Sequence, residues 1–92
     1  MQVVDQRLPG AEIVAAGLSD LAARRETPES LLVSMAATRL GQLGYPVAEP
    51  FPEPELRLWQ RLSLDDPDAA HGRYNALVRR LVSFQRAAVC AV

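Results

Sequence analysis

The chain has 92 residues, which suits one small domain, and 49% of them are hydrophobic. Ten basic residues, all of them Arg, nearly balance eleven acidic ones and give a formal net charge of −1. This composition is that of a globular protein, and it excludes a disordered acidic chain and a strongly basic nucleic-acid-binding domain.

Three features bear on where the protein works. The abundance of Arg and Ala, without any Lys, favours a GC-rich bacterial genome. The single cysteine, Cys90, has no partner within the chain for a disulfide. The N-terminus lacks the apolar run of a signal peptide, and no stretch has the roughly 18 apolar residues of a membrane span. We therefore expect a cytoplasmic protein with no membrane segment.

A first helix is expected from Pro9 to about Arg25. Proline is tolerated in the first turn of a helix, and arginines suit the negative end of the helix dipole. The apolar stripe of this helix comprises Ile13, Val14, Gly17, Leu18, Leu21 and Ala22. Residues 1–8 carry no comparable signal, and we interpret them as a segment open to disorder.

A second helix is expected to begin at Thr27-Pro28-Glu29. These residues supply a capping hydroxyl, a proline at the first helical position and an acid in the first turn. Gly44, which precedes Tyr45-Pro46, is the end signal. The expected buried face consists of Leu32, Met35, Ala36, Leu40 and Leu43. The short connection between the first two helices predicts an antiparallel hairpin.

Residues 44–54 form a proline-rich connector, with prolines at positions 46, 50, 52 and 54. Proline holds the backbone in extended conformations and excludes helix and central strand. A ligand for SH3 or WW domains is the alternative, but no two of these prolines have the spacing that a PxxP core requires. We interpret the segment as a stiff strap between two helical hairpins.

The second hairpin follows the strap. A third helix opens at Pro54 or Glu55 and ends before Asp66, which caps a fourth helix running to about Cys90. In the third helix, the residues expected to point inward are Leu56, Leu58, Trp59 and Leu62. The predicted fold is therefore all-α: one small four-helix domain, residues 1–92, built from two helical hairpins joined by the proline-rich strap.

The fourth helix has an unusually broad apolar face. Its central line is Ala70, Tyr74, Leu77, Leu81, Phe84 and Ala88, and it is widened by Val78, Val82, Gln85 and Val89. One small domain hides an arc of this width with difficulty, and the second helix adds the apolar run 31–33. We therefore predict a protein-protein interaction module, either a homodimer or a partner subunit of another protein. The predicted interface residues are Leu32, Met35, Tyr74, Leu77, Val78, Leu81 and Val82.

Four arginines on the fourth helix support an alternative function. Arg73 and Arg80 fall on one line of the helix, and Arg79 and Arg86 fall on another. A helix that tracks phosphates has such lines, so these residues are candidate contacts to an anion or to nucleic acid. The sequence pI of about 5.7 argues against this function, because nucleic-acid-binding domains carry an overall basic balance.

The sequence contains no motif for catalysis: a GxSxG elbow, a Walker loop, dinucleotide-binding glycines and HExxH or CxxC pairs are all missing. Asp68 and His71 share a helix face, but a metal site needs three or four ligands. About 28 Å of helix separates His71 from Cys90, which excludes a thiol-imidazole pair within the chain. We predict no enzymatic activity, no catalytic or metal-binding residues and no cofactor. If a pocket exists, Trp59, His71 and Tyr74 are expected to converge on it.

Overall fold

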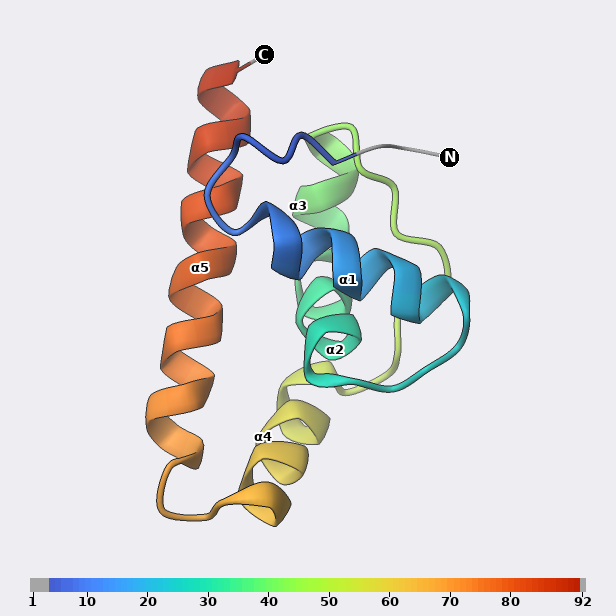
Figure 1. The fold of residues 1–92 in the computed structure, drawn as a ribbon. Coiled ribbons are helices and arrows are strands. Elements are labelled where there is room, and N and C mark those ends of the chain that lie inside the picture. The colour runs from blue at the N-terminus through green and yellow to red at the C-terminus, as the bar shows by residue number, and fades with distance from the viewer. Residues whose placement is uncertain (1–3, 92) are drawn as a thin grey trace.

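The computed structural model describes residues 4–91, and within them the chain forms helices, turns and loops but no strand (Figure 1). The helices are α1 (Ala11–Ala22), α2 (Pro28–Met35), α3 (Ala37–Gln42), α4 (Pro54–Asp65) and α5 (Ala70–Ala91). The predicted all-α fold and its non-helical strap are confirmed. One element differs: the predicted second helix is divided at Ala36 into α2 and α3.

The helices are arranged around α5, which runs along one side of the molecule, and α1, which lies steeply across it (Figure 1). α2 and α3 follow one another behind α1, and α4 lies at the end of the molecule remote from the C-terminal end of α5. The start of α1 abuts the middle of α5, because Gly10 lies directly against the backbone of Arg80. The molecule measures 38 × 24 × 18 Å.

The start of α2 forms as its sequence predicts. The Thr27 hydroxyl accepts a hydrogen bond from the Ser30 amide at 3.1 Å, and the Ser30 hydroxyl accepts one from the Thr27 amide at 2.8 Å. Pro28 takes the first helical position. This reciprocal capping box satisfies two backbone donors and fixes the residue at which α2 begins.

The end of α2 is marked by a serine. The Ser34 hydroxyl donates to the Ser30 carbonyl at 2.8 Å and accepts a hydrogen bond from the Phe51 amide at 3.1 Å. A hydroxyl bonded back to the preceding turn of its own helix favours a bend. Ala36, at φ −100° and ψ 17°, leaves helical geometry before α3 begins. The sequence does not indicate this break, because residues 27–43 keep one apolar periodicity throughout.

The strap, residues 44–54, is attached to three helices or their ends. Besides the Ser34–Phe51 hydrogen bond, Arg24 Nη1 donates to the Glu49 carbonyl at 2.8 Å. The Arg24 guanidinium carbon also lies 4.6 Å from the centroid of the Phe51 ring. Tyr45 packs against Phe84 of α5, with ring centroids 5.5 Å apart. These contacts hold the extended segment against the end of α1, against α2 and against α5. Figure 1 shows α1 lying across α2, so the two helices do not form the antiparallel hairpin that the sequence predicts.

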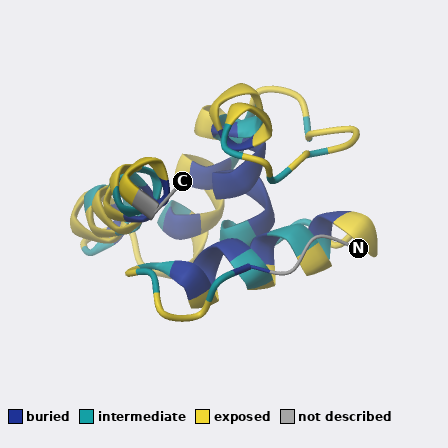
Figure 2. Ribbon diagram, turned by 90° about the horizontal axis from the view of Figure 1, so that it is seen from above, coloured by how far each residue is buried: buried dark blue, intermediate teal, exposed yellow. Residues whose placement is uncertain are grey.

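The core lies where α1, α2, α4 and α5 meet, and Figure 2 shows the buried parts of the helices turned towards the centre of the molecule. Its largest fully buried apolar side chains are Phe84, Leu31, Leu32, Leu40, Leu58, Leu62, Val14 and Val33. Val4 is only 5% exposed and belongs to this core, and Leu8 packs against it. The segment 1–8, interpreted above as open to disorder, is thus anchored from Val4 onwards, and residues 1–3 lie outside the described residues.

The longest helix, α5, meets the core along one line of its surface. Ala70, Leu81, Phe84 and Ala88 are buried on that line, while Val89 remains 46% exposed. The core therefore covers the centre of the broad apolar arc and leaves part of its edge at the surface. Neither α5 nor any other helix in residues 4–91 is long and apolar enough to cross a bilayer.

Candidate interaction surface

The residues of α4 that face the core differ from those that the sequence predicts. Leu58 and Leu62 are buried, but Leu56 is 52% exposed and Trp59 is 41% exposed, so their expected inward orientation is wrong. At about 100° per residue, Leu56 and Leu58 lie about 160° apart round the helix and cannot enter one core together. α4 carries two apolar stripes: its helix neighbours bury the one that contains Leu58 and Leu62 and leave the other partly exposed.

The second stripe consists of uncharged residues, and a hollow along one of its sides is lined by Leu56, Gln60 and Leu64 together with Glu26, Glu53, Arg57 and Arg61. We call this stripe the α4 outer face; it consists of Leu56, Trp59, Gln60, Ser63 and Leu64. Leu64 is the most exposed of its large apolar side chains, at 87%. A shallow hollow on this face is lined by Trp59, Gln60, Ser63 and Leu64. Arg57 and Arg61 lie beside the face, and both form ion pairs with Glu26. The residues of the face are therefore uncharged, and the two arginines along one side of it share Glu26 as their ion-pair partner.

Trp59 connects the α4 outer face to α5. Its ring meets the ring of His71 with centroids 6.3 Å apart and that of Tyr74 with centroids 6.2 Å apart, both nearly edge to face. The His71 ring nitrogen Nε2 in turn lies 3.1 Å from the Asn75 side-chain amide. The structure thus brings together Trp59, His71 and Tyr74, as the sequence predicts. They form a packed aromatic corner at the surface between the two helices.

A second exposed surface continues from this corner along α5. We call it the α5 flank; it consists of Tyr74, Val78, Val82, Gln85 and Val89, which follow one another at intervals of three or four residues. Apart from Val89, these side chains are half-buried. The flank meets the α4 outer face because Tyr74 is in contact with Trp59. The two helices therefore present one continuous surface with few charges.

The interface residues predicted from sequence separate into two groups. Leu32 and Leu81 are 0% and 5% exposed, so they form part of the core and are not available to a partner. Their apolar character serves the packing of α2 and α5 within the chain. The others are half-buried: Met35, Tyr74, Leu77, Val78 and Val82. The sequence does not predict the exposure of Leu56 and Trp59, although the lack of charge at positions 56, 59, 60, 63 and 64 was the available signal.

The four arginines predicted as anion or nucleic-acid contacts do not form one patch. Arg73 is paired with Asp65, and Arg80 is paired with Glu12 of α1. Arg79 and Arg86 are exposed on the other line of α5 and have no ion-pair partner within residues 4–91. Two of the four positive charges are therefore already offset inside the molecule.

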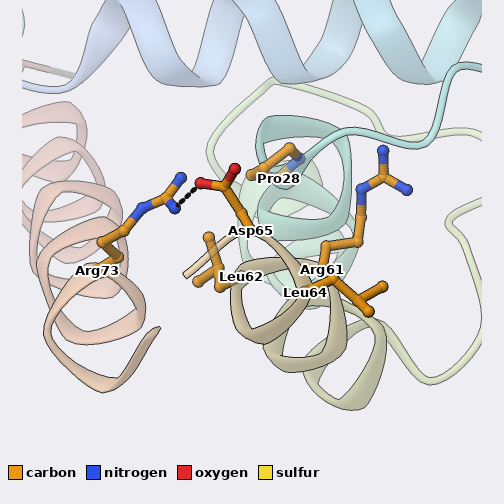
Figure 3. A pocket seen from close by; sticks show the side chains of 6 residues that line it. All are labelled: Pro28, Arg61, Leu62, Leu64, Asp65 and Arg73. Carbon is orange, nitrogen blue, oxygen red and sulfur yellow. Dashed lines mark hydrogen bonds and ion pairs between the residues drawn. The ribbon is translucent and has the colours of Figure 1, made fainter. Parts of the chain in front are cut away.

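Figure 3 shows the Arg73–Asp65 pair at a hollow between the end of α4, the start of α2 and the first turns of α5. The hollow is lined by Pro28, Arg61, Leu62, Leu64, Asp65 and Arg73. Both of its arginines are ion-paired, Arg61 with Glu26 across the α1–α2 connection. An anion bound in this hollow would compete with Asp65 and Glu26 for the guanidinium groups.

The acidic residues near the ends of α4 show no metal-site geometry. Asp66 Oδ1 accepts hydrogen bonds from the amides of Asp68 and Ala69, in the turn that leads into α5. Among residues 4–91, no three His, Cys, Asp or Glu side chains are grouped as a metal ion requires. Cys90 is an exposed free thiol near the end of α5. The Asp66 carboxylate thus caps the turn that leads into α5.

Comparison with protein-family models, with curated proteins and with solved structures finds no match for this chain. Its function therefore has to be argued from its surface. The most unusual feature of that surface is the α4 outer face together with the adjoining α5 flank.

Proposed function

We propose that the protein is a small helical protein-protein interaction module, a homodimer or a partner subunit, that binds through the α4 outer face. The observation that carries this proposal is the exposure of Leu56, Trp59 and Leu64 on one side of α4. Full burial of such side chains contributes roughly 1.5–3 kcal/mol each. A partner that covers all three would gain several kcal/mol from this face alone.

The fold itself does not require large apolar side chains there. Leu58 and Leu62 supply the contact of α4 with the core, since both are almost completely buried. Single exposed leucines are ordinary on protein surfaces, whereas a cluster with a tryptophan at its edge is typical of interaction sites. Trp59 is also held by His71 and Tyr74, so its ring is preorganised for a partner.

Photo-crosslinking in the cells that make the protein tests the proposal directly. A photoreactive phenylalanine analogue at Gln60, in the middle of the face, is expected to give an adduct with a second copy or with another protein. The same analogue at Gln42, an exposed residue of α3, is the matched control. The adduct at position 60 should disappear in a Leu56→Glu, Leu64→Glu variant. Absence of any adduct at position 60, with the wild-type amount of folded protein, would overturn the proposal.

Nucleic-acid binding is the alternative, and the observation in its favour is the exposed line of Arg79 and Arg86. A domain that binds through phosphates needs several uncompensated cations, but Arg73 and Arg80 are ion-paired. A fluorescent single-stranded or double-stranded oligonucleotide at low salt distinguishes the two functions. Salt-sensitive binding that is lost in Arg79→Ala, Arg86→Ala would support the alternative.

The proposed interaction function is consistent with a cytoplasmic location, where Cys90 stays reduced.

A further inference from the structure

The two parts of the candidate surface differ in the charges that border them. Glu53 and Glu55 lie at the start of α4, and Asp66 and Asp68 follow its end. None of these four carboxylates has an ion-pair partner within residues 4–91. The α4 outer face is therefore an apolar strip with uncompensated negative charge at both ends.

The α5 flank has the opposite character. Arg79 and Arg86 lie beside it on its solvent side, each one turn from Val82, and neither is ion-paired in the described part of the chain. At 1.5 Å per residue, the flank from Tyr74 to Val89 is about 22 Å long, and the α4 outer face from Leu56 to Leu64 is about 12 Å long. The α4 strip thus fits within the length of the α5 flank, and the two strips share apolar character and are opposite in bordering charge.

We propose that the α4 outer face of one copy docks on the α5 flank of a second copy, and the reverse, in a two-fold symmetric dimer. This inference rests on the proposed function and names its partner. The two strips meet at Trp59 and Tyr74, so a two-fold axis near this corner lets both pairs of strips engage at once. Acidic ends of α4 then face Arg79 and Arg86 of the other copy, which favours this pairing.

A dimer made by two α4 outer faces alone is disfavoured by the same charges. An antiparallel arrangement would place Glu53 and Glu55 beside Asp66 and Asp68 of the other copy. A parallel arrangement would place each acidic end beside its own equivalent. Like charges oppose association in both cases, whereas the pairing of α4 with α5 brings unlike charges together in both halves of the interface.

Charge-reversal variants test the pairing by sedimentation equilibrium over a wide concentration range. Arg79→Glu, Arg86→Glu makes the α5 flank acidic, and Glu53→Arg, Glu55→Arg makes one end of α4 basic. In a dimer of either variant, like charges face each other in both halves of the interface. We therefore expect this dimer to be roughly tenfold or more weaker than the wild-type dimer. An equimolar mixture restores unlike charges in both halves, so a heterodimer near wild-type affinity is expected. Arg39→Glu, on exposed α3, is the control and should leave the dimer unchanged.

The outcomes separate this inference from the proposed function. A wild-type dimer that is insensitive to Arg79→Glu, Arg86→Glu but dissociates in Leu64→Glu would overturn the α4-to-α5 pairing and retain the α4 outer face as the interface. A wild-type protein that stays monomeric at the highest concentration would also overturn the pairing, and the crosslink at Gln60 then decides the proposed function alone. Circular dichroism verifies that each variant folds. Weakening of the wild-type dimer by added salt is the second measurement, independent of any variant.

Discussion

Gly17 of α1 lies directly against the backbone of Glu29 on α2: a Cβ added at Gly17 would be 2.4 Å from the Glu29 carbonyl oxygen. The same Cβ would be 2.7 Å from a methyl carbon of Val33. Both distances are shorter than atoms at real Cβ positions tolerate, and one of the neighbours is backbone that cannot rotate away. The missing side chain of Gly17 therefore sets how closely α1 approaches α2.

Replacing Gly17 with alanine is expected to destabilise the protein by about 1–3 kcal/mol, although alanine is the better helix former. The cost arises because α1 and α2 must move apart at their crossing. Gly72→Ala is the control: it lies on exposed helix, nothing stands within 4 Å of its added Cβ, and it should stabilise by up to about 1 kcal/mol. Urea unfolding followed by circular dichroism measures both changes. A neutral Gly17→Ala would contradict the close crossing.

Two leucines of α4 provide a test of how the helix is rotated. Leu58 is fully buried, so Leu58→Ala should cost about 2–5 kcal/mol in the free energy of unfolding. Leu56, 52% exposed, lies on the α4 outer face, and Leu56→Ala should change the stability of the monomer by less than about 0.5 kcal/mol. The comparison is made by thermal unfolding at a concentration at which the protein is monomeric. Equal losses at the two positions would restore the inward orientation that the sequence predicts for Leu56.

Most of the fold follows from local sequence signals, which do not depend on contacts with distant residues. Thr27 and Pro28 start α2 through atoms within three residues, and the prolines of the strap exclude helix by their own geometry. The break at Ala36 could not be predicted in this way. It accompanies a hydrogen bond between Ser34 and Phe51, seventeen residues away, and nothing in the periodicity of 27–43 indicates it.

The candidate surface was predicted only in part, and for a physical reason. Hydrophobic periodicity identifies apolar residues but does not say which stripe of a two-striped helix the rest of the chain covers. For α5 the sequence predicts a contact with a second chain along the apolar line, whereas Ala70, Leu81, Phe84 and Ala88 of that line are buried in the core and Tyr74 and Leu77 are half-buried. For α4, which of the two stripes faces the core depends on where α2 and α5 lie. The periodicity therefore predicts that Leu56 and Trp59 point inward together with Leu58. The meeting of Trp59 and Tyr74 was predictable because a short turn joins their helices.

Asp20 predicts a pH dependence of stability. The Thr27 hydroxyl donates to its carboxylate at 2.8 Å and Arg25 at 2.9 Å, and these hydrogen bonds hold the pKa of Asp20 below its ordinary value. The folded state therefore binds a proton less readily than the unfolded state. The resulting stabilisation is present above about pH 4 and is lost as the pH falls from there through the lowered pKa.

The variant Asp20→Asn measures this contribution. At pH 7 it should lose about 1 kcal/mol, the usual net contribution of such a hydrogen bond, and the difference from wild type should shrink towards zero as the pH falls below 3. Glu49→Gln, an exposed carboxylate of the strap, is the matched control and should follow wild type at every pH. Melting curves between pH 2 and pH 7 provide the comparison. A difference that grows at low pH would contradict the direction of the shift.

Ser34 is expected to hold the strap in place. In Ser34→Ala the Phe51 amide loses its acceptor and the Ser30 carbonyl loses a donor, so we expect a loss of about 1–3 kcal/mol. Hydrogen exchange of the Phe51 amide should become faster, while amides of α5 keep their order of protection. Ser83→Ala, exposed on α5, is the control. Unchanged exchange at Phe51 would mean that the contacts of Arg24 with Glu49 and the Phe51 ring, and of Tyr45 with Phe84, fix the strap without Ser34.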